Sequence, residues 1–191
     1  MDFHIITECF VDTKLIKSLV PPTKNSYNHQ KAVSMVEKTM KTKFDDEFAV
    51  GIIDRDKNEL AYLSEFDSVF CHDKPGGKPQ IELFKHREKH HYIIVHTNME
   101  RWLLDCADEA KIDLQDFGLP NSLKDLIKIT KTAVSEKDDT YSKPLSDLFR
   151  ALLKSSVTSF LLLQYWVNYL KTENYGAKMD RLANESTQFI Q

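Results

Sequence analysis

The chain has 191 residues, of which 41% are hydrophobic and 29% charged, with a net charge of −3. This length and composition suit one compact domain, or a domain with a helical extension. The near balance of charge excludes a basic nucleic-acid-binding surface spread over the whole molecule. Any binding of nucleic acid must therefore depend on a local patch or on bound metal.

The chain contains three cysteines, Cys9, Cys71 and Cys106, and no signal-peptide pattern. A small and odd number of cysteines is typical of proteins from a reducing compartment, so we expect a cytoplasmic protein. The longest apolar run, residues 160–163 followed by 165–167, is too short to span a bilayer, so we expect no membrane contact.

The first half of the chain alternates between apolar runs typical of buried strands and segments with one apolar helical face. Long connections between apolar strands favour parallel crossovers. Residues 60–63 fit either a short strand or a helical turn. In chain order, the pattern predicts a strand over 3–8, helices around 13–19 and 28–42, strands over 47–54, 81–86 and 92–95, and a helix over 99–110.

The second half of the chain indicates helices near 121–132, 144–154 and 156–172, followed by a polar tail over 174–191 that we expect to fray. Together the two halves predict an α/β fold, with a mainly parallel, Rossmann-like sheet flanked by helices and a C-terminal helical extension.

Acidic residues close two of the predicted strands. Glu8 ends the first, and Asp54 and Asp56 follow the buried strand that precedes them. Open α/β sheets bind ligands at the carboxyl ends of their strands, and carboxylate oxygens are the ligands that Mg²⁺ prefers. An Asp-x-Asp after a strand is also common as an ordinary turn or helix cap. The combination of the three carboxylates predicts a metal site.

This order of strand-Glu, helix and strand-Asp-x-Asp resembles the topoisomerase–primase (TOPRIM) domain over roughly residues 3–110. The segment 93–104, in which a strand is followed by a glutamate and a tryptophan, is similar to small TOPRIM-like bacterial proteins. The resemblance implies that Glu8 is a general acid or base and that Asp54 and Asp56 bind Mg²⁺ or Mn²⁺. It also implies a TOPRIM-like domain over 1–115 and a helical extension, packed on it, over 116–191.

The function that the resemblance implies is metal-dependent phosphodiester chemistry on DNA or RNA, in the manner of a nuclease. Small proteins of this kind sometimes act beside a separate ATPase subunit, and this chain has no ATPase motif of its own. TOPRIM domains usually have glycine after the catalytic glutamate, where this chain has Cys9. A catalytically silent module that binds a protein partner or nucleic acid is therefore one alternative. A hydrolase of small phosphate esters is another.

Two further acidic residues are candidates for accessory roles. Asp12 can add a metal ligand from the head of the first helix, although capping that helix is the simpler role. Glu100 lies in the first turn of its helix, where a negative charge is favourable in any case. The basic run 85–91, rich in histidine, has no closed zinc-site spacing and reads as a solvated turn, with contact to a nucleic-acid backbone as the alternative.

Overall fold

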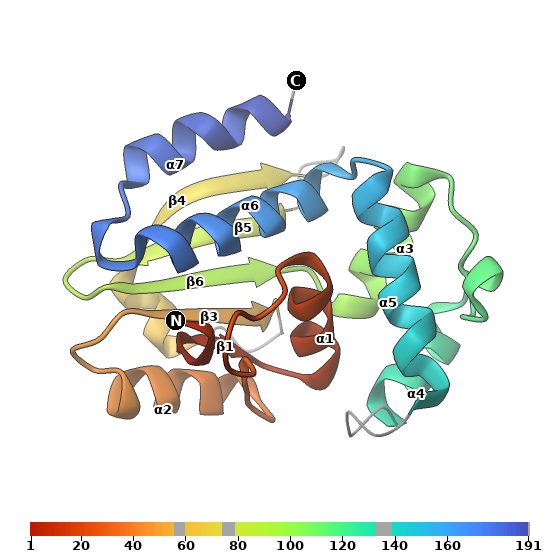
Figure 1. The fold of residues 1–191 in the computed structure, drawn as a ribbon, viewed down its shortest axis with the longest axis horizontal. Helices are drawn as coiled ribbons and strands as arrows, with labels where there is room; N and C mark the ends of the chain where they lie inside the picture. The colour runs from red at the N-terminus through yellow and green to blue at the C-terminus, as the bar shows by residue number, and fades with distance from the viewer. Residues whose placement is uncertain (56–59, 74–78, 133–138, 191) are drawn as a thin grey trace.

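The computed structural model describes residues 1–55, 60–73, 79–132 and 139–190. These residues form an α/β fold in which helices cover both faces of one six-stranded sheet (Figure 1). The strands are β1 (Ile5–Thr7), β2 (Asn28–His29), β3 (Ala49–Asp54), β4 (Phe66–Asp73), β5 (Pro79–His86) and β6 (His91–His96). The α-helices are α1 (Phe10–Leu19), α2 (Val33–Lys43), α3 (Met99–Ala110), α4 (Leu123–Thr132), α5 (Asp139–Lys154), α6 (Thr158–Glu173) and α7 (Met179–Ser186).

The sheet is mostly parallel, as the sequence predicted. Its strand order is β2-β1-β3-β6-β5-β4. Strands β2, β1, β3 and β6 are parallel to one another, and β5 is antiparallel to both of its neighbours. The buried strands β3 and β6 therefore bring their carboxyl ends to the same edge of the sheet. In Figure 1 their arrows point toward the side where α1, α3 and α5 lie.

The strands bury side chains on both faces of the sheet, as continuous apolar runs predict for parallel strands. Ile5 and Val50 belong to a large core that also includes apolar residues of α1, α3, α5 and α6. Ile6 and Ala49 belong to a smaller core on the other face, which α2 covers. At Gly51 a Cβ atom would lie 3.0 Å from the sulfur of Met40, so glycine allows α2 to approach β3 closely.

The connections on either side of β1 create a crevice at the carboxyl edge. After β1 the chain passes through α1 to β2 on one side of β1, and it then returns through α2 to β3 on the other side. Helices α1 and α2 pack on opposite faces, because their apolar residues belong to different cores. The carboxyl ends of β1 and β3 therefore meet at a topological switch point, where sheets of this kind bind ligands.

Several elements differ from the predictions, and α5 is one of them, because it begins at Asp139 rather than near residue 144. Helix α2 begins at Val33 rather than near residue 28, because Asn28 and His29 pair with β1 as the short strand β2. The edge strand β4 was not predicted. The tail expected to fray instead contains α7, whose Ser186 hydroxyl accepts a hydrogen bond of 2.8 Å from the Trp166 indole. The undecided segment 60–63 begins a 3₁₀ helix over Ala61–Glu65.

Candidate functional site

Glu8 and Asp54 are neighbours at the switch point. Glu8 directly follows β1, and its backbone N–H donates a 3.0 Å hydrogen bond to the carbonyl of Ile52 on β3. Its side chain turns toward the end of β3, where Oε2 accepts a 3.0 Å hydrogen bond from the backbone N–H of Asp54. The pairing of two parallel strands thus places together two of the three carboxylates that the sequence singled out.

Asp54 is the last residue of β3, and its side chain is 22% exposed. One carboxylate oxygen, Oδ2, lies 3.4 Å from the backbone N–H of Met99 at the head of α3. The other, Oδ1, is buried and accepts no hydrogen bond within the described residues. It lies 3.2 Å from Nδ1 of His96.

Asp12 caps α1, as the simpler of its two predicted roles requires, and it also contacts His96. It forms a capping box at the start of α1, in which its Oδ2 accepts from the N–H of Cys9 at 3.0 Å and the Cys9 sulfur accepts from the N–H of Asp12 at 3.4 Å. Its second oxygen, Oδ1, lies 3.0 Å from Nε2 of His96. Asp12 is fully buried, so it belongs both to the helix cap and to the cluster.

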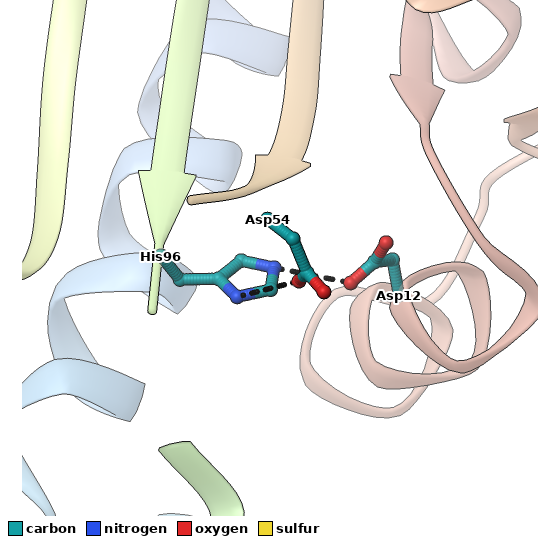
Figure 2. Close-up of side chains that lie close together, drawn as sticks. All are labelled: Asp12, Asp54 and His96. Carbon is teal, nitrogen blue, oxygen red and sulfur yellow. Dashed lines mark hydrogen bonds and ion pairs between the residues drawn. The ribbon is translucent and has the colours of Figure 1, made fainter. Parts of the chain in front are cut away.

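His96 joins the two aspartates. It ends β6 directly opposite Asp54 in the strand register, is fully buried, and stacks on the indole of Trp102 with a centroid distance of 5.0 Å. Figure 2 shows the carboxylates of Asp12 and Asp54 beside its ring. Nδ1 also donates to the carbonyl of Thr97 at 2.7 Å. Since a carbonyl only accepts and the carboxylate of Asp12 faces Nε2, both ring nitrogens act as donors, as in an imidazolium.

The pKa values of this cluster follow from burial and from charge. Burial alone would lower the pKa of His96, but the carboxylates of Asp54 and Asp12 raise it to about 9. Burial raises the pKa of Asp54 to about 7; His96 opposes that rise, whereas Asp12 and Glu8 add to it. The cluster therefore gathers several acidic groups around the ring of His96, which carries one positive charge when both of its nitrogens are protonated.

The same atoms are suited to a cation. One ligand atom each from Asp12, Asp54 and His96 lies within 4.8 Å of the others, a spacing that lets them converge on one metal ion. The buried Oδ1 of Asp54, which accepts no hydrogen bond within the described residues, supports this fit. Two carboxylates and an imidazole form a mixed oxygen and nitrogen donor set, which suits Mn²⁺ or Zn²⁺ better than the oxygen-preferring Mg²⁺.

A cleft of about 530 Å³ opens beside Asp54 at this edge of the sheet. Glu100 lines it, and the hydroxyl of Thr130 on α4 donates a hydrogen bond to the Glu100 carboxylate. Glu100 is 8% exposed. A glutamate whose only role is to place a negative charge in the first turn of a helix is normally exposed to solvent, so Glu100 is more buried than that role requires. The lining comes from α1, β2, β3, α3 and α4, and includes Cys9, Phe10, Val11, His29, Lys31, Asn98, Met99, Ile127 and Lys131.

Cys9, for which the resemblance to TOPRIM domains implies glycine, fits its position without strain. Its backbone is extended, with φ −127° and ψ 173°, so the turn does not require glycine. Burial, reinforced by the charge of Asp12, raises the pKa of the Cys9 thiol. The thiol is thus kept neutral, and its role is to cap α1 rather than to act as a nucleophile.

Of the residues predicted for the site, the structure gathers Glu8, Asp54 and Asp12 at one edge and places Glu100 in the adjoining cleft. Asp56 lies outside the described residues. His96 was not predicted as part of the site. The sequence feature that could have identified His96 is its position at the end of a buried strand. That strand, β6, pairs with β3, so His96 lies at the same edge as Asp54.

The basic run lies elsewhere. It forms the turn between β5 and β6, at the amino end of β6 and therefore at the opposite edge from Asp54. Arg87 pairs with Asp67 at 2.9 Å, and Lys89 pairs with Asp45. Since acidic partners neutralise both cations, this turn has less positive charge to offer a nucleic-acid backbone than its sequence suggests.

Comparisons with protein families, curated proteins and solved structures find no match for this chain. Within the part of the chain that the structure describes, no helix combines the length and apolar character needed to cross a bilayer. The carboxyl edge of the sheet, with its acidic cluster and cleft, is therefore the feature that points to a function.

Proposed function

We propose that this chain is a metal-dependent enzyme that cleaves phosphodiester bonds in nucleic acid, as its resemblance to TOPRIM domains implies. The observation that carries the proposal is the meeting of Glu8 and Asp54 on adjacent parallel strands at the switch point, joined by a 3.0 Å hydrogen bond. The acidic residues at the ends of these strands are the ones that the resemblance makes functional, and an open cleft lies beside Asp54.

The metal, Mn²⁺ or Mg²⁺, would be held by Asp54 with Asp12 and His96, and by Asp56 if its side chain reaches the same ion. When bound, the ion would supply positive charge against a phosphodiester. Binding requires a neutral His96 and ionised aspartates, so metal competes with the protons that the cluster otherwise holds. The mixed donor set favours Mn²⁺ over Mg²⁺.

Glu8 is the residue we assign to proton transfer. It is half-buried beside Asp54, and its Oε2 accepts a hydrogen bond from the backbone N–H of Asp54. A carboxylate held in this way by the backbone keeps its position whether or not the aspartates bind metal. It can therefore take a proton from an attacking water or give one to a leaving oxygen near the cleft.

One observation favours the alternative of a catalytically silent binding module. The ring of His96 already lies 3.0 Å from Asp12 and 3.2 Å from Asp54, so both aspartates have a cationic partner without metal. If that ion pair is permanent, the cluster serves stability alone. The two functions differ in one measurable property, which is whether divalent metal stabilises the fold.

The test combines metal binding with cleavage. Purified protein is melted with and without Mn²⁺ or Mg²⁺, and is incubated with single- and double-stranded DNA and RNA. We expect metal to raise the melting temperature of the wild type. Glu8→Gln should keep that rise and lose about 10²- to 10⁴-fold in cleavage rate. Asp54→Asn should lose both properties, because it removes a metal ligand.

Asp108→Asn is the matched control, because Asp108 is 89% exposed near the far end of α3. It should behave as wild type in both measurements. An identical response to metal in wild type and Asp54→Asn would contradict the metal site. Cleavage that survives in both Glu8→Gln and Asp54→Asn would come from another site or from a contaminant.

A further inference from the structure

The cleft beside Asp54 is lined by basic side chains that a metal site does not need. Two lysines line it, Lys31 from the segment after β2 and Lys131 from α4. Both are exposed, and within the described residues neither pairs with a carboxylate. The cleft also contains the acidic Asp54 and Glu100. Lysines that do not pair with these nearby carboxylates are available to an anionic ligand, such as a phosphate group.

Two aromatic rings line the same cleft. Phe10 starts α1 and His29 ends β2, and their rings meet edge to face with a centroid distance of 6.4 Å. Phe10 is half-buried and His29 is exposed, so part of each ring remains accessible. A large apolar ring at the head of a helix, where it lines a polar cleft, provides a surface on which a flat base can stack.

We infer that this cleft binds a single strand of nucleic acid, with Lys31 and Lys131 contacting phosphates and Phe10 and His29 stacking an unpaired base. Base stacking on protein rings requires a base whose face is free, and the faces of bases inside a duplex are covered by their neighbours. The volume of about 530 Å³ is that of a small-ligand pocket, which suits a short piece of one strand.

This inference rests on the proposed function for the position of the reacting phosphate near Asp54. The contacts that select a single strand come from other residues. Positive charge along the groove and aromatic rings on which bases stack are the features shared by proteins that bind single strands. Here Lys31 and Lys131 supply the charge, and Phe10 and His29 supply the rings. Because the net charge of the chain is −3, binding depends on these local contacts and should be sensitive to salt.

The test measures binding without metal or cleavage. All variants are made in an Asp54→Asn background, which removes a metal ligand and a charge that repels phosphate. Fluorescence anisotropy in EDTA follows labelled oligonucleotides of about 12 nucleotides, a length within the usual site sizes. The probes are single-stranded DNA, single-stranded RNA, and a blunt DNA duplex of the same sequence. We expect both single strands to bind at least about tenfold more tightly than the duplex.

Phe10→Leu keeps an apolar side chain but removes the ring, and should weaken single-strand binding about fivefold or more. Lys31→Met and Lys131→Met should each weaken it, and each should reduce the slope of log affinity against log salt by about 0.7. Phe3→Leu and Lys38→Met are the matched controls. Phe3 is an exposed ring against Phe44, and Lys38 is exposed on α2, on the other face of the sheet.

Duplex binding as tight as single-strand binding would overturn the inference. So would affinities of the Phe10→Leu and lysine variants within twofold of the background protein. Failure here is distinguishable from failure of the proposed function. Single-strand binding with no cleavage by the wild type in Mn²⁺ would refute the nuclease and leave the cleft assignment standing. Cleavage that is unchanged by Phe10→Leu and Lys131→Met would refute the cleft assignment and leave the nuclease standing.

Discussion

His91 and His96 open and close the same strand, β6, and both side chains are fully buried. His91 meets neutral partners: its Nε2 donates to the carbonyl of Phe44 at 2.7 Å, and its Nδ1 accepts from the hydroxyl of Tyr62 at 2.5 Å. Burial lowers the pKa of His91. His96 meets two carboxylates, which raise its pKa to about 9. Both rings are equally buried, so the difference in their charge comes from the partners that the fold supplies.

The difference has a functional meaning. At the amino end of β6 the ring of His91 hydrogen-bonds to an uncharged carbonyl and an uncharged hydroxyl. At the carboxyl end the sheet gathers more acidic groups than one histidine can neutralise, since Glu8 lies beside Asp54 as well. A cluster that must bind protons or a cation to be stable is poised to exchange one for the other. This is the property that separates a candidate site from an ordinary buried network.

The largest expected change in stability comes from replacing His96, the cationic residue at the carboxyl end of β6. His96→Leu leaves the buried carboxylate of Asp12 without its partner, and should destabilise the protein by about 3–5 kcal/mol at pH 7 in urea unfolding. In the double variant Asp12→Asn/His96→Leu the unpaired charge is gone, so we expect much of the loss to be recovered. A cost below about 1 kcal/mol for His96→Leu would mean that His96 is not paired as described.

A smaller effect is the pH dependence of stability, which should have opposite signs for His91 and His96 at the two ends of β6. Since the pKa of His91 is lowered in the folded state, the unfolded chain binds a proton below about pH 6.5 that the folded chain does not. Its contribution to stability is therefore lost as pH falls below that value, by at most about 1.4 kcal/mol per pH unit. The raised pKa of His96 acts in the opposite direction: its contribution is present below about pH 6.5 and is lost as pH rises through about 9.

The check on this contrast is urea unfolding from pH 5 to pH 10 in wild type and His91→Gln. Glutamine can still donate to the carbonyl of Phe44 and accept from Tyr62, but it does not titrate. The loss of stability on the acid side should become shallower in His91→Gln, while the loss on the alkaline side should remain. An unchanged acid side would show that His91 does not stay neutral in the fold.

The extent to which the sequence predicted the fold depended on how local the signals were. The apolar run before Asp54 and the apolar helical face over 99–110 are local patterns, and they correctly predicted β3 and α3. The strand β2 spans two residues, too short for any periodic pattern, and it exists only because β1 offers a paired edge. The tail forms α7 because it packs against the sheet and α6, and a polar sequence does not reveal such a contact.

The part of the candidate site that lies at strand ends was predictable from the sequence, because Glu8 and Asp54 come at the ends of apolar runs. The role of His96 depends on the register of β3 against β6 and on the capping box that turns Asp12 toward its ring. Neither is a property of the residues near His96 in sequence. Its neighbours His86, His90 and His91 made the segment read as a basic turn, although His96 lies at the opposite end of the strand from that turn.

The most direct test of the central claim is to add Mn²⁺ while following the imidazole signals of the histidines by NMR spectroscopy. Before metal is added, both ring nitrogens of His96 should be protonated at pH 7, and one nitrogen of His91 should be unprotonated. Substoichiometric Mn²⁺ should then broaden the signals of His96 far more than those of His91, and Asp54→Asn should abolish that difference. A wild-type protein whose His96 signals stay sharp and doubly protonated at saturating Mn²⁺ would contradict a metal site at this edge of the sheet.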